Sequence, residues 1–544
     1  MEITDDTYVI ALHPGENQND FYGMVTEVVD EFITNDQIFV ARLSDTQVIA
    51  LGNDDRVIGI DNMAEMDASI EEDADNTLPA NRASPYNTSS IYVDRGNWAL
   101  HRHTSLTNNF TAENTDHTMS FTYPQDGGVD VDGTGVDIVA CIQGVPDITN
   151  AGYKDSGVSR IQEYQWNTLT GLSGQATIDY NTKTPGDHGE AVLAFACHNT
   201  YGWAKGAKIY IMPRTWESNV YWWEAVRLFH KAKVDAGGSV RPTVFIASFG
   251  YSSGHGQFGF RKIQFRGTDY TTARGLLGMS RSGPFQAWKD FGMPIAIRLS
   301  EQDTVKTLVT NMENEGVFNV ISAGNKAQKH DVPGGPDYDN TIWGGREATE
   351  PSPPRYTNRD SALAGPNTII VGNMNSAFNS IVSGKETLWD TSSKGPRVDC
   401  VMGGANLTLD KTHWGSTGDY VASGTSFTAP QVAGILAMVL QKYPSTTQAQ
   451  ARKYFREHAI GTDTLYDPGI SPTSDAGDYG DPEYFGNPLA LNGYSGNILY
   501  LDPAMAFDPS TITNTTIIYP TETLVSSKLN YTISQINQKL STLP

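Results

Sequence analysis

A serine with the means to act as a nucleophile stands at residue 426, in the string GTSFTAPQVAG of residues 424–434. The run ILAMVLQKYP that follows is helical in character, and Pro430 falls in its first turn, where a missing N–H costs little. A serine at a helix start has its own N–H and the helix dipole close by, and both stabilise an oxyanion. The commoner use of such a serine is an ordinary N-cap, so Ser426 needs partners before it indicates catalysis.

Two other polar residues occupy comparable positions, where a strand ends or a helix starts. His188 lies in DHG, residues 187–189, ahead of an apolar helical run, and Asn325 ends ISAGN, residues 321–325. A histidine can act as general base, and an asparagine amide can donate to an oxyanion. Each alone is usually structural. Their order along the chain, each at a strand–helix junction, favours one shared catalytic site.

The stretch GVDIVACIQGV, residues 135–145, has the character of a buried strand that ends in a tight turn. In α/β enzymes the carboxyl end of such a strand is where chemistry is usually placed. That end offers only Ile142 and Gln143, and neither is an acid or a base.

A parallel sheet has to bring these residues together, and apolar runs supply its strands. Between about residues 93 and 505, apolar strands alternate with helical patterns, which predicts an α/β domain with helices on both faces of the sheet. The strands are expected at VDIVACI (136–142), AKIYIM (207–212), TVFIAS (243–248), FNVISA (318–323) and TIIVG (368–372).

Residues 1–62 read as a separate small α+β domain of ferredoxin-like type. Strands are expected at 8–12, 37–43 and 56–60, and a helix over 16–33. Ser44 and Gln47 form a capping-box pattern at the start of a further short helix.

Two other segments lack the pattern of a packed domain. Residues 63–92 are acidic and then rich in Asn, Ser and Pro, which predicts a linker. Residues 506–544 form a Thr/Asn-rich arm, and within them Leu529, Ile533, Ile536, Leu540 and Leu543 make one narrow apolar stripe over 526–544. That helix either packs on its own domain or docks on another subunit, with 508–525 as the arm that carries it away.

These motifs resemble those of the subtilisin-like serine proteases, the subtilases, over roughly residues 1–505. The resemblance implies a subtilisin-like parallel sheet flanked by helices, with Ser426 as nucleophile, His188 as general base and Asn325 as oxyanion donor. It implies that SFG, Ser248, Phe249 and Gly250, is the strand that pairs with a substrate backbone. Residues 1–62 resemble the inhibitor-like propeptide of the family, and NWALHR (97–102) resembles the start of its mature domain.

The same resemblance identifies what is absent. Subtilases carry the triad aspartate at the end of the first core strand, and an alignment without gaps places Ile142 at that position. Losing this carboxylate costs about four orders of magnitude in kcat, roughly 6 kcal/mol of barrier. The sequence therefore predicts a pseudoprotease kept as a structural or binding component. The alternative is an active but slow serine endopeptidase with a substitute acid such as Asp147. A hydrogen bond between His188 and Ser426 is expected in either case.

The composition limits the classes of molecule that the chain is expected to bind. With 38 Lys+Arg against 62 Asp+Glu, the formal charge is −24, which disfavours nucleic acid and anionic membranes. No secretory signal or transmembrane run is visible. Similar subtilase-like chains are carried by large tailed bacteriophages, so a virion component is favoured, with a cytoplasmic protein as the alternative. Other protein subunits are the expected partners.

No cofactor is expected and no metal site is assigned. The family often binds calcium, but the acidic loop 333–340 reads as a solvated loop. The N-terminal domain is expected to dock on the catalytic domain, with the following tether passing the cleft near residues 248–250, as family propeptides do.

Overall fold

The structure is a computed structural model of the 544-residue chain. It describes residues 3–31, 37–68, 70–72, 98–104, 106, 131–170, 177–182, 186–214, 218–253, 260–265, 267–271, 297–298, 303–325, 328–344, 355–356, 358–375, 381–382, 385–389, 391–411, 418–461, 465, 497–517 and 519.

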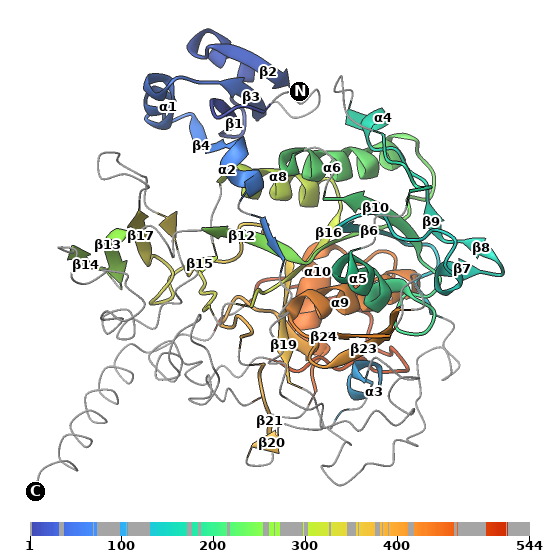
Figure 1. The fold of residues 1–544 in the computed structure, drawn as a ribbon. Coiled ribbons are helices and arrows are strands. Elements are labelled where there is room, and N and C mark those ends of the chain that lie inside the picture. The colour runs from blue at the N-terminus through green and yellow to red at the C-terminus, as the bar shows by residue number, and fades with distance from the viewer. Residues whose placement is uncertain are drawn as a thin grey trace, which may run out of the picture.

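A parallel sheet forms the centre of the molecule, as the sequence predicts (Figure 1). Among the described residues it has seven strands in the order β22-β19-β16-β11-β6-β10-β9, and every pairing is parallel. Most of these strand residues are buried, because helices cover both faces of the sheet. The strands are β6 (Asp137–Ile142), β9 (Ile161–Gln162), β10 (Lys208–Pro213), β11 (Thr243–Ala247), β16 (Phe318–Ser322), β19 (Ile369–Met374) and β22 (Cys400–Gly403).

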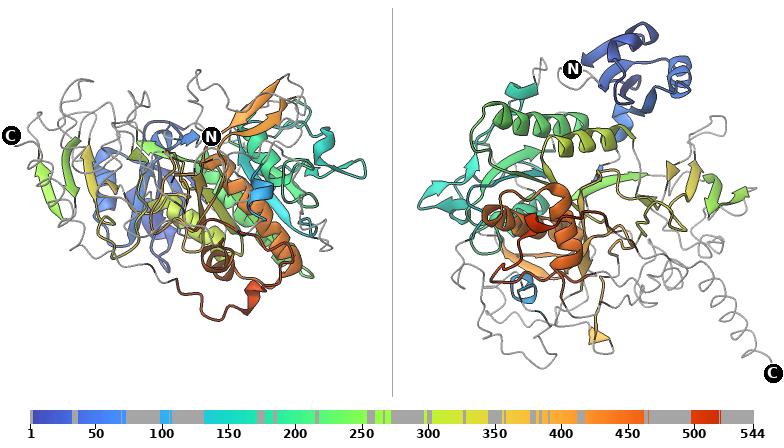
Figure 2. Two further views of the ribbon diagram at one scale, coloured as in Figure 1. Left: turned by 90° about the horizontal axis from the view of Figure 1, so that it is seen from below. Right: turned by 180° about the vertical axis from the view of Figure 1, so that it is seen from behind.

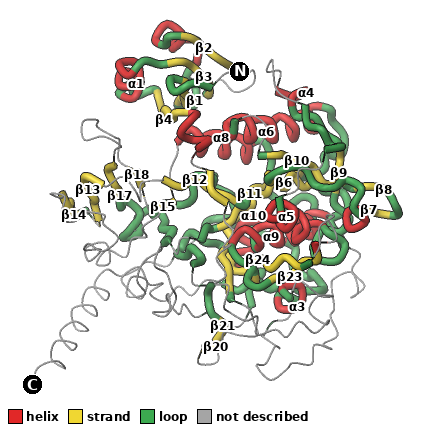
Figure 3. Tube along the Cα trace, in the orientation of Figure 1, coloured by secondary structure: helices red, strands yellow, loops and turns green. Residues whose placement is uncertain are grey.

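The helices lie in two layers, one on each face of the sheet (Figures 1 and 2), and Figure 3 colours them red. On one face α6 (Asn219–Asp235) packs against α8 (Asp303–Asn314). On the other, α5 (Asp187–Cys197) packs against α9 (Ala429–Lys442), which is buried along nearly its whole length. The helix that starts with the histidine motif therefore lies beside the helix that follows the serine motif. The short helices are α3 (Ala99–Arg102), α4 (Asn167–Thr170) and α10 (Gln448–Lys453).

Smaller sheets surround this body. They are built from β7 (Lys154–Asp155) with β8 (Val158–Ser159), β20 (Ile381–Val382) with β21 (Lys385–Glu386), β23 (Leu407–Asp410) with β24 (Asp419–Ala422), and the four strands β13 (Phe260–Phe265), β14 (Thr268–Thr271), β17 (Thr341–Gly344) and β18 (Arg355–Tyr356). No helix among the described residues is long and apolar enough to cross a membrane.

The N-terminal domain has an antiparallel sheet in the order β2-β3-β1-β4, the ferredoxin-like arrangement that the sequence predicts. Its strands are β1 (Thr7–Leu12), β2 (Glu27–Glu31), β3 (Ile38–Arg42) and β4 (Val57–Asn62). Helix α1 (Asp45–Gly52) begins with the expected capping box of Ser44 and Gln47. The expected helix over 16–33 is wrong, because only Gln18–Met24 form a 3₁₀ helix and β2 follows it.

The first part of the expected linker is folded. After β4 come α2 (Met63–Ala68) and β5 (Ile70–Glu72), so regular structure runs about ten residues past position 62. Strand β5 pairs with β12 (Phe249–Ser253), whose other edge pairs with β15 (Ile297–Arg298). The remainder of 63–92 lies outside the described residues.

The N-terminal domain lies on α6 and α8 (Figure 1). Two of its carboxylates accept hydrogen bonds from residues at the start of each helix. Asp67 Oδ1 accepts from Ser218 Oγ at 3.0 Å, from Asn219 N at 3.1 Å and from the Asn219 amide, where α6 begins. Asp61 accepts from Thr304 Oγ1 in the first turn of α8. Carboxylates at helix N-termini satisfy N–H groups that have no partner within the helix. Burial raises the pKa of Asp67, and these hydrogen bonds oppose the rise.

Residues 98–104, which overlap the string NWALHR (97–102), are bound firmly into the body. Trp98 Nε1 donates to Ala405 O at 2.9 Å, and Arg102 forms a buried ion pair with Glu386. The His103 ring accepts from Gly403 N at 2.8 Å through Nε2, so Nδ1 carries the proton and donates to Leu499 O at 2.6 Å. Burial lowers the pKa of His103 to about 3.

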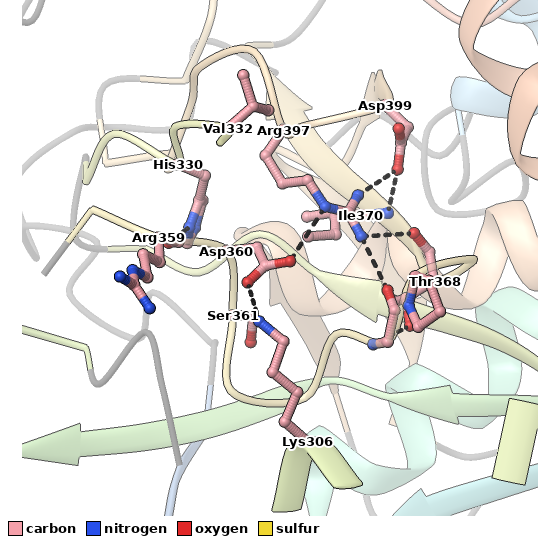
Figure 4. Close-up of polar contacts among 12 residues, drawn as sticks. Lys306, His330, Val332, Arg359, Asp360, Ser361, Thr368, Ile370, Arg397 and Asp399 are labelled. Atoms are coloured by element: carbon pink, nitrogen blue, oxygen red, sulfur yellow. Dashed lines mark hydrogen bonds and ion pairs between the residues drawn. The ribbon is translucent and has the colours of Figure 1, made fainter. Parts of the chain in front are cut away.

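An ionic cluster joins α8 to the segment that leads into β22 (Figure 4). Arg452 of α10 also contacts Asp399, at 3.0 Å. Arg397 contacts Asp399 at 2.9 Å and Asp360 at 3.4 Å, and Lys306 of α8 contacts Asp360 at 2.9 Å. Although burial of Asp399 acts in the opposite direction, Arg452, Arg397 and Arg456 hold its pKa below the ordinary value. The cluster thus fixes α10 against the sheet edge.

The stretch expected to carry the C-terminus away instead lies against α10 as far as it is described. Gln450 Nε2 donates to Ser510 O and Ile512 O, both at 2.9 Å, and Lys453 Nζ donates to Thr516 O at 2.7 Å. Arg452 donates to the Tyr519 hydroxyl at 2.7 Å. The expectation of a free arm is therefore wrong for residues 510–519. The stripe of Leu529 to Leu543 lies outside the described residues.

Replacing Asp67 with alanine tests the docking of the N-terminal domain. The change leaves donors of Ser218 and Asn219 at the start of α6 without their acceptor, so we expect the free energy of unfolding to fall by about 1–2 kcal/mol. Urea denaturation of the full chain measures it. Glu65→Ala, at an exposed carboxylate of the same helix α2, is the control. Equal midpoints for the two variants would show that Asp67 does not hold the interface.

Candidate active site

Ser426 is positioned by a turn that only glycine accommodates well. Gly424 has φ +130°, and Thr425–Phe427 then form a 3₁₀ turn that leads into α9. Ser426 is fully buried. Its Oγ donates to Ser248 O at 3.1 Å, and Ser248 Oγ donates to Ser426 O at 2.9 Å. These reciprocal bonds hold the serine against the end of β11, next to the expected substrate strand.

Thr425 of the serine turn is hydrogen-bonded to Asn325 and Gly324 of the loop after β16. Asn325 Oδ1 accepts from Thr425 N and from Thr425 Oγ1, both at 3.0 Å, and Thr425 Oγ1 accepts from Gly324 N at 3.0 Å. Since a backbone N–H can only donate, the Asn325 amide has its oxygen toward Thr425 and its NH₂ group turned away. This is the orientation that an oxyanion donor needs.

His188 lies in the first turn of α5, against the serine turn. Its ring centroid is 5.4 Å from that of Phe427, the residue after Ser426. The side chain is 8% exposed. The structure therefore brings together His188, Asn325, Ser426 and the strand Ser248, Phe249 and Gly250, as the sequence predicts. The chemical roles of these residues stay predictions.

In this structure the Ser426 hydroxyl donates to Ser248 O at 3.1 Å, so it does not donate to His188. The Ser426 hydroxyl has one proton, and it is directed at the Ser248 carbonyl. A general base has to receive that proton, so this arrangement is not the activated nucleophile of a working triad.

Ile142 lies against the start of α5, next to Gly189, the residue after His188. A Cβ added to Gly189 would lie 2.6 Å from Gln143 O and 3.3 Å from Ile142 Cβ, so the start of α5 lies directly on the end of β6. Ile142 is 3% exposed and contributes only hydrocarbon. The start of α5 thus meets an apolar side chain at the position where the resemblance expects a carboxylate.

A cation missed by the sequence reasoning lies close to the same ring. Arg214 directly follows β10, and its backbone N donates to Ile142 O at 2.8 Å. Burial first, and then the charge of Arg214, lower the pKa of His188 to about 3. A shift of this size corresponds to about 5 kcal/mol against the imidazolium. No motif singles out Arg214, because its proximity to His188 arises only when β10 pairs with β6.

Asp147, which the sequence offers as a substitute acid, and Asp137 of β6 both form short-range polar contacts. Asp147 Oδ1 accepts from Thr149 N at 2.9 Å and Thr149 Oγ1 at 2.6 Å, which closes a turn after β6. Asp137 begins β6 at the opposite edge of the sheet, and there it pairs with Lys233 at 2.9 Å and Arg241 at 2.6 Å.

The expectation that the acidic loop 333–340 is solvated holds for Asp339, whose side chain is 77% exposed, but is wrong for Asp337. Asp337 is fully buried, and Asp331 and Lys329 are each 1% exposed. Lys329 Nζ lies 2.8 Å from Asp337 Oδ2 and 3.6 Å from Asp331 Oδ2. The cation among these carboxylates is an ammonium of the chain itself, so this loop does not fit a calcium ion.

Comparisons with known proteins agree with this architecture. The family model described as "Subtilase family" matches residues 134–487. A thermostable alkaline protease of Halalkalibacterium halodurans is 37% identical over 82 residues, 14% of this chain and 22% of that protein. Subtilisin of Bacillus pumilus is 30% identical over 169 residues, 30% of this chain and 48% of its own. The chain thus matches less than half the length of either relative.

Solved structures with a similar fold include a cold-adapted subtilisin-like serine proteinase, with TM-score 0.39 and 15% identity over 69% of this chain and all of that one. Fervidolysin from Fervidobacterium pennivorans, described as a keratinolytic enzyme related to subtilisin, has TM-score 0.44 and 15% identity over 90% of this chain and 62% of its own.

The protonation of His188 tests this site directly. We expect its imidazole to stay neutral from about pH 8 to pH 5, where an ordinary histidine with a pKa of about 6.5 takes up a proton. Histidine NMR spectra measure this, with His188→Gln assigning the signal. Arg214→Met should raise the pKa of His188.

Because the pKa of His188 is depressed in the folded chain, its neutral imidazole adds to the free energy of unfolding above about pH 6.5. This contribution is lost as the pH falls toward 3. If His188 of the unmodified chain takes up its proton near pH 6.5, burial and Arg214 do not lower its pKa as described.

Proposed function

Because the chain belongs to the subtilase family, whose model covers residues 134–487, we propose that it is a pseudoprotease, which holds an extended peptide in its cleft without cutting it. The observation that carries the proposal is the surroundings of His188: isoleucine where the family has its aspartate, and the charge of Arg214 close by. In this reading the fold serves as a structural or binding component.

The chemistry explains why these surroundings matter. In a working site the histidine takes the serine proton during attack, so an imidazolium forms while the oxyanion develops. A carboxylate stabilises that imidazolium, whereas buried hydrocarbon and a nearby cation oppose it. Here the disfavoured charge on His188 adds to the missing aspartate. Both effects oppose the proton transfer that would activate Ser426, which supports the proposal.

The alternative is a slow endopeptidase that uses Asp147 as a substitute acid. The bonds of Asp147 to Thr149 favour a turn-forming role for this aspartate. The geometry therefore supports the pseudoprotease reading over the alternative.

As to setting, we propose a component of a virus particle, on the strength of the acidic charge of −24 and the likeness of the motifs to phage-borne subtilases. Detection of the full chain by mass spectrometry in purified particles would support it, and its recovery only from the soluble lysate of infected cells would contradict it.

A chain that does not cut itself should stay whole. Subtilases normally release their propeptide, so intact mass spectrometry of purified protein should give a single species that starts near Met1. A species starting near Asn97 that disappears in Ser426→Ala would show self-cleavage and overturn the proposal.

Peptide hydrolysis measures the central chemistry. We expect the unmodified chain to turn over far below the roughly 1–10³ s⁻¹ of ordinary enzymes. Ile142→Asp should raise the rate of peptide hydrolysis by at least about tenfold, because it supplies a carboxylate that orients His188 and stabilises its imidazolium. Ile142→Asn, similar in size but uncharged, and Ile142→Asp with Ser426→Ala are the controls. Ordinary turnover by the unmodified chain would instead indicate a substitute acid.

A further inference from the structure

The edge of β12 beside Ser426 accepts an extended strand. Strand β5 pairs with it in antiparallel register, with Ile70 opposite Tyr251, Glu71 opposite Gly250 and Glu72 opposite Phe249. Going from residue 70 to residue 72, the strand therefore runs toward Ser248, whose carbonyl accepts from Ser426 Oγ. A strand in this register approaches the serine with its C-terminal end.

Arg214 lies beside the first residue of that edge. Its guanidinium carbon is 5.3 Å from the centroid of the Phe249 ring. The ring is buried against Trp222 and Trp223 of α6, with centroids 5.8 Å and 6.2 Å away. The aromatic base supports the guanidinium through a cation–π contact. The result is a positive charge beside Phe249, at the edge of β12 that pairs with β5.

The register of an antiparallel pair determines which residue of an added strand lies on the same face as the Arg214 guanidinium. Directly opposed residues of an antiparallel pair project their side chains on the same face of the sheet. The residue opposite Phe249 therefore projects on the face where the Phe249 ring carries Arg214. In this chain that register position holds Glu72, within the acidic sequence IEEDAD of residues 70–75.

We propose that Arg214 makes the cleft selective for extended peptides that carry a carboxylate side chain opposite Phe249. The chain's own β5 is the occupant in cis, and an acidic peptide of another protein competes for the same edge. The inference rests on the proposed function, in that the peptide is held and not cut. A guanidinium and a carboxylate favour one another by charge and by paired hydrogen bonds, so a glutamine at this position should bind more weakly.

Charge reversal tests the cis contact in the full chain. Hydrogen exchange of the amides in residues 70–72 and 249–251 should rise about tenfold in Arg214→Glu and in Glu72→Arg, and return toward the wild-type rate when both changes are combined. Lys208→Glu, at an exposed lysine at the far end of β10, makes the same charge change as a control. Wild-type protection in Arg214→Glu, or no recovery in the double variant, would overturn the proposal.

A labelled peptide tests selectivity in trans. The peptide ASIEEDAD, amidated at its end, should bind the full-length Glu72→Arg variant about tenfold more tightly than ASIEQDAD does, and Arg214→Met should remove the preference. A free C-terminal acid should make no difference. Dependence on that free acid, or equal affinity of both peptides, would place the recognition elsewhere. Mass spectrometry of the bound peptide separates the two ideas, because cleavage would refute the non-cutting function and leave the preference of Arg214 intact.

Discussion

The contact between the end of β6 and the start of α5 governs what this site can do. Gly189 lets the helix rest on the backbone of Gln143, and this brings the turn that carries His188 against whatever side chain ends the strand. With Ile142 at the end of the strand, and with Arg214 bound through its backbone to Ile142 O, burial and the charge of Arg214 lower the pKa of His188. Every consequence for catalysis follows from the cost of charging that ring.

The remainder of the site is built independently of this contact. Two sets of hydrogen bonds hold it without residues of β6 or α5. One set joins Thr425 to Asn325 and Gly324, and the other joins Ser248 to Ser426. The proposal that the chain binds a peptide without cutting it therefore concerns the histidine side of the site alone. The N-terminal domain fits this proposal, because β5 pairs with β12 and Asp67 and Asp61 hold the domain on α6 and α8.

The sequence predicted best those features that depend on near neighbours. The sheet strands, the capping box at Ser44 and the helix after Ser426 follow from local pattern. The helix expected at 16–33 failed because Val28 and Val29 favour a strand that β3 can pair with, and pairing overrides an amphipathic pattern.

What the sequence could not supply arises from contacts between distant segments. Arg214 reaches the site only because β10 pairs with β6, and Asp337 is buried because Lys329 neutralises it. The approach of β5 to β12 and the bonds of residues 510–519 to α10 likewise join segments far apart in the chain.

The reactivity of Ser426 toward a fluorophosphonate tests the account most directly, because the reagent needs an activated serine but no substrate recognition. At pH 7–8 we expect intact mass and peptide mapping to show no modification of Ser426 after hours with excess reagent. Rapid stoichiometric modification of Ser426 that His188→Gln abolishes would show that the histidine activates the serine despite Ile142 and Arg214, and would contradict the account.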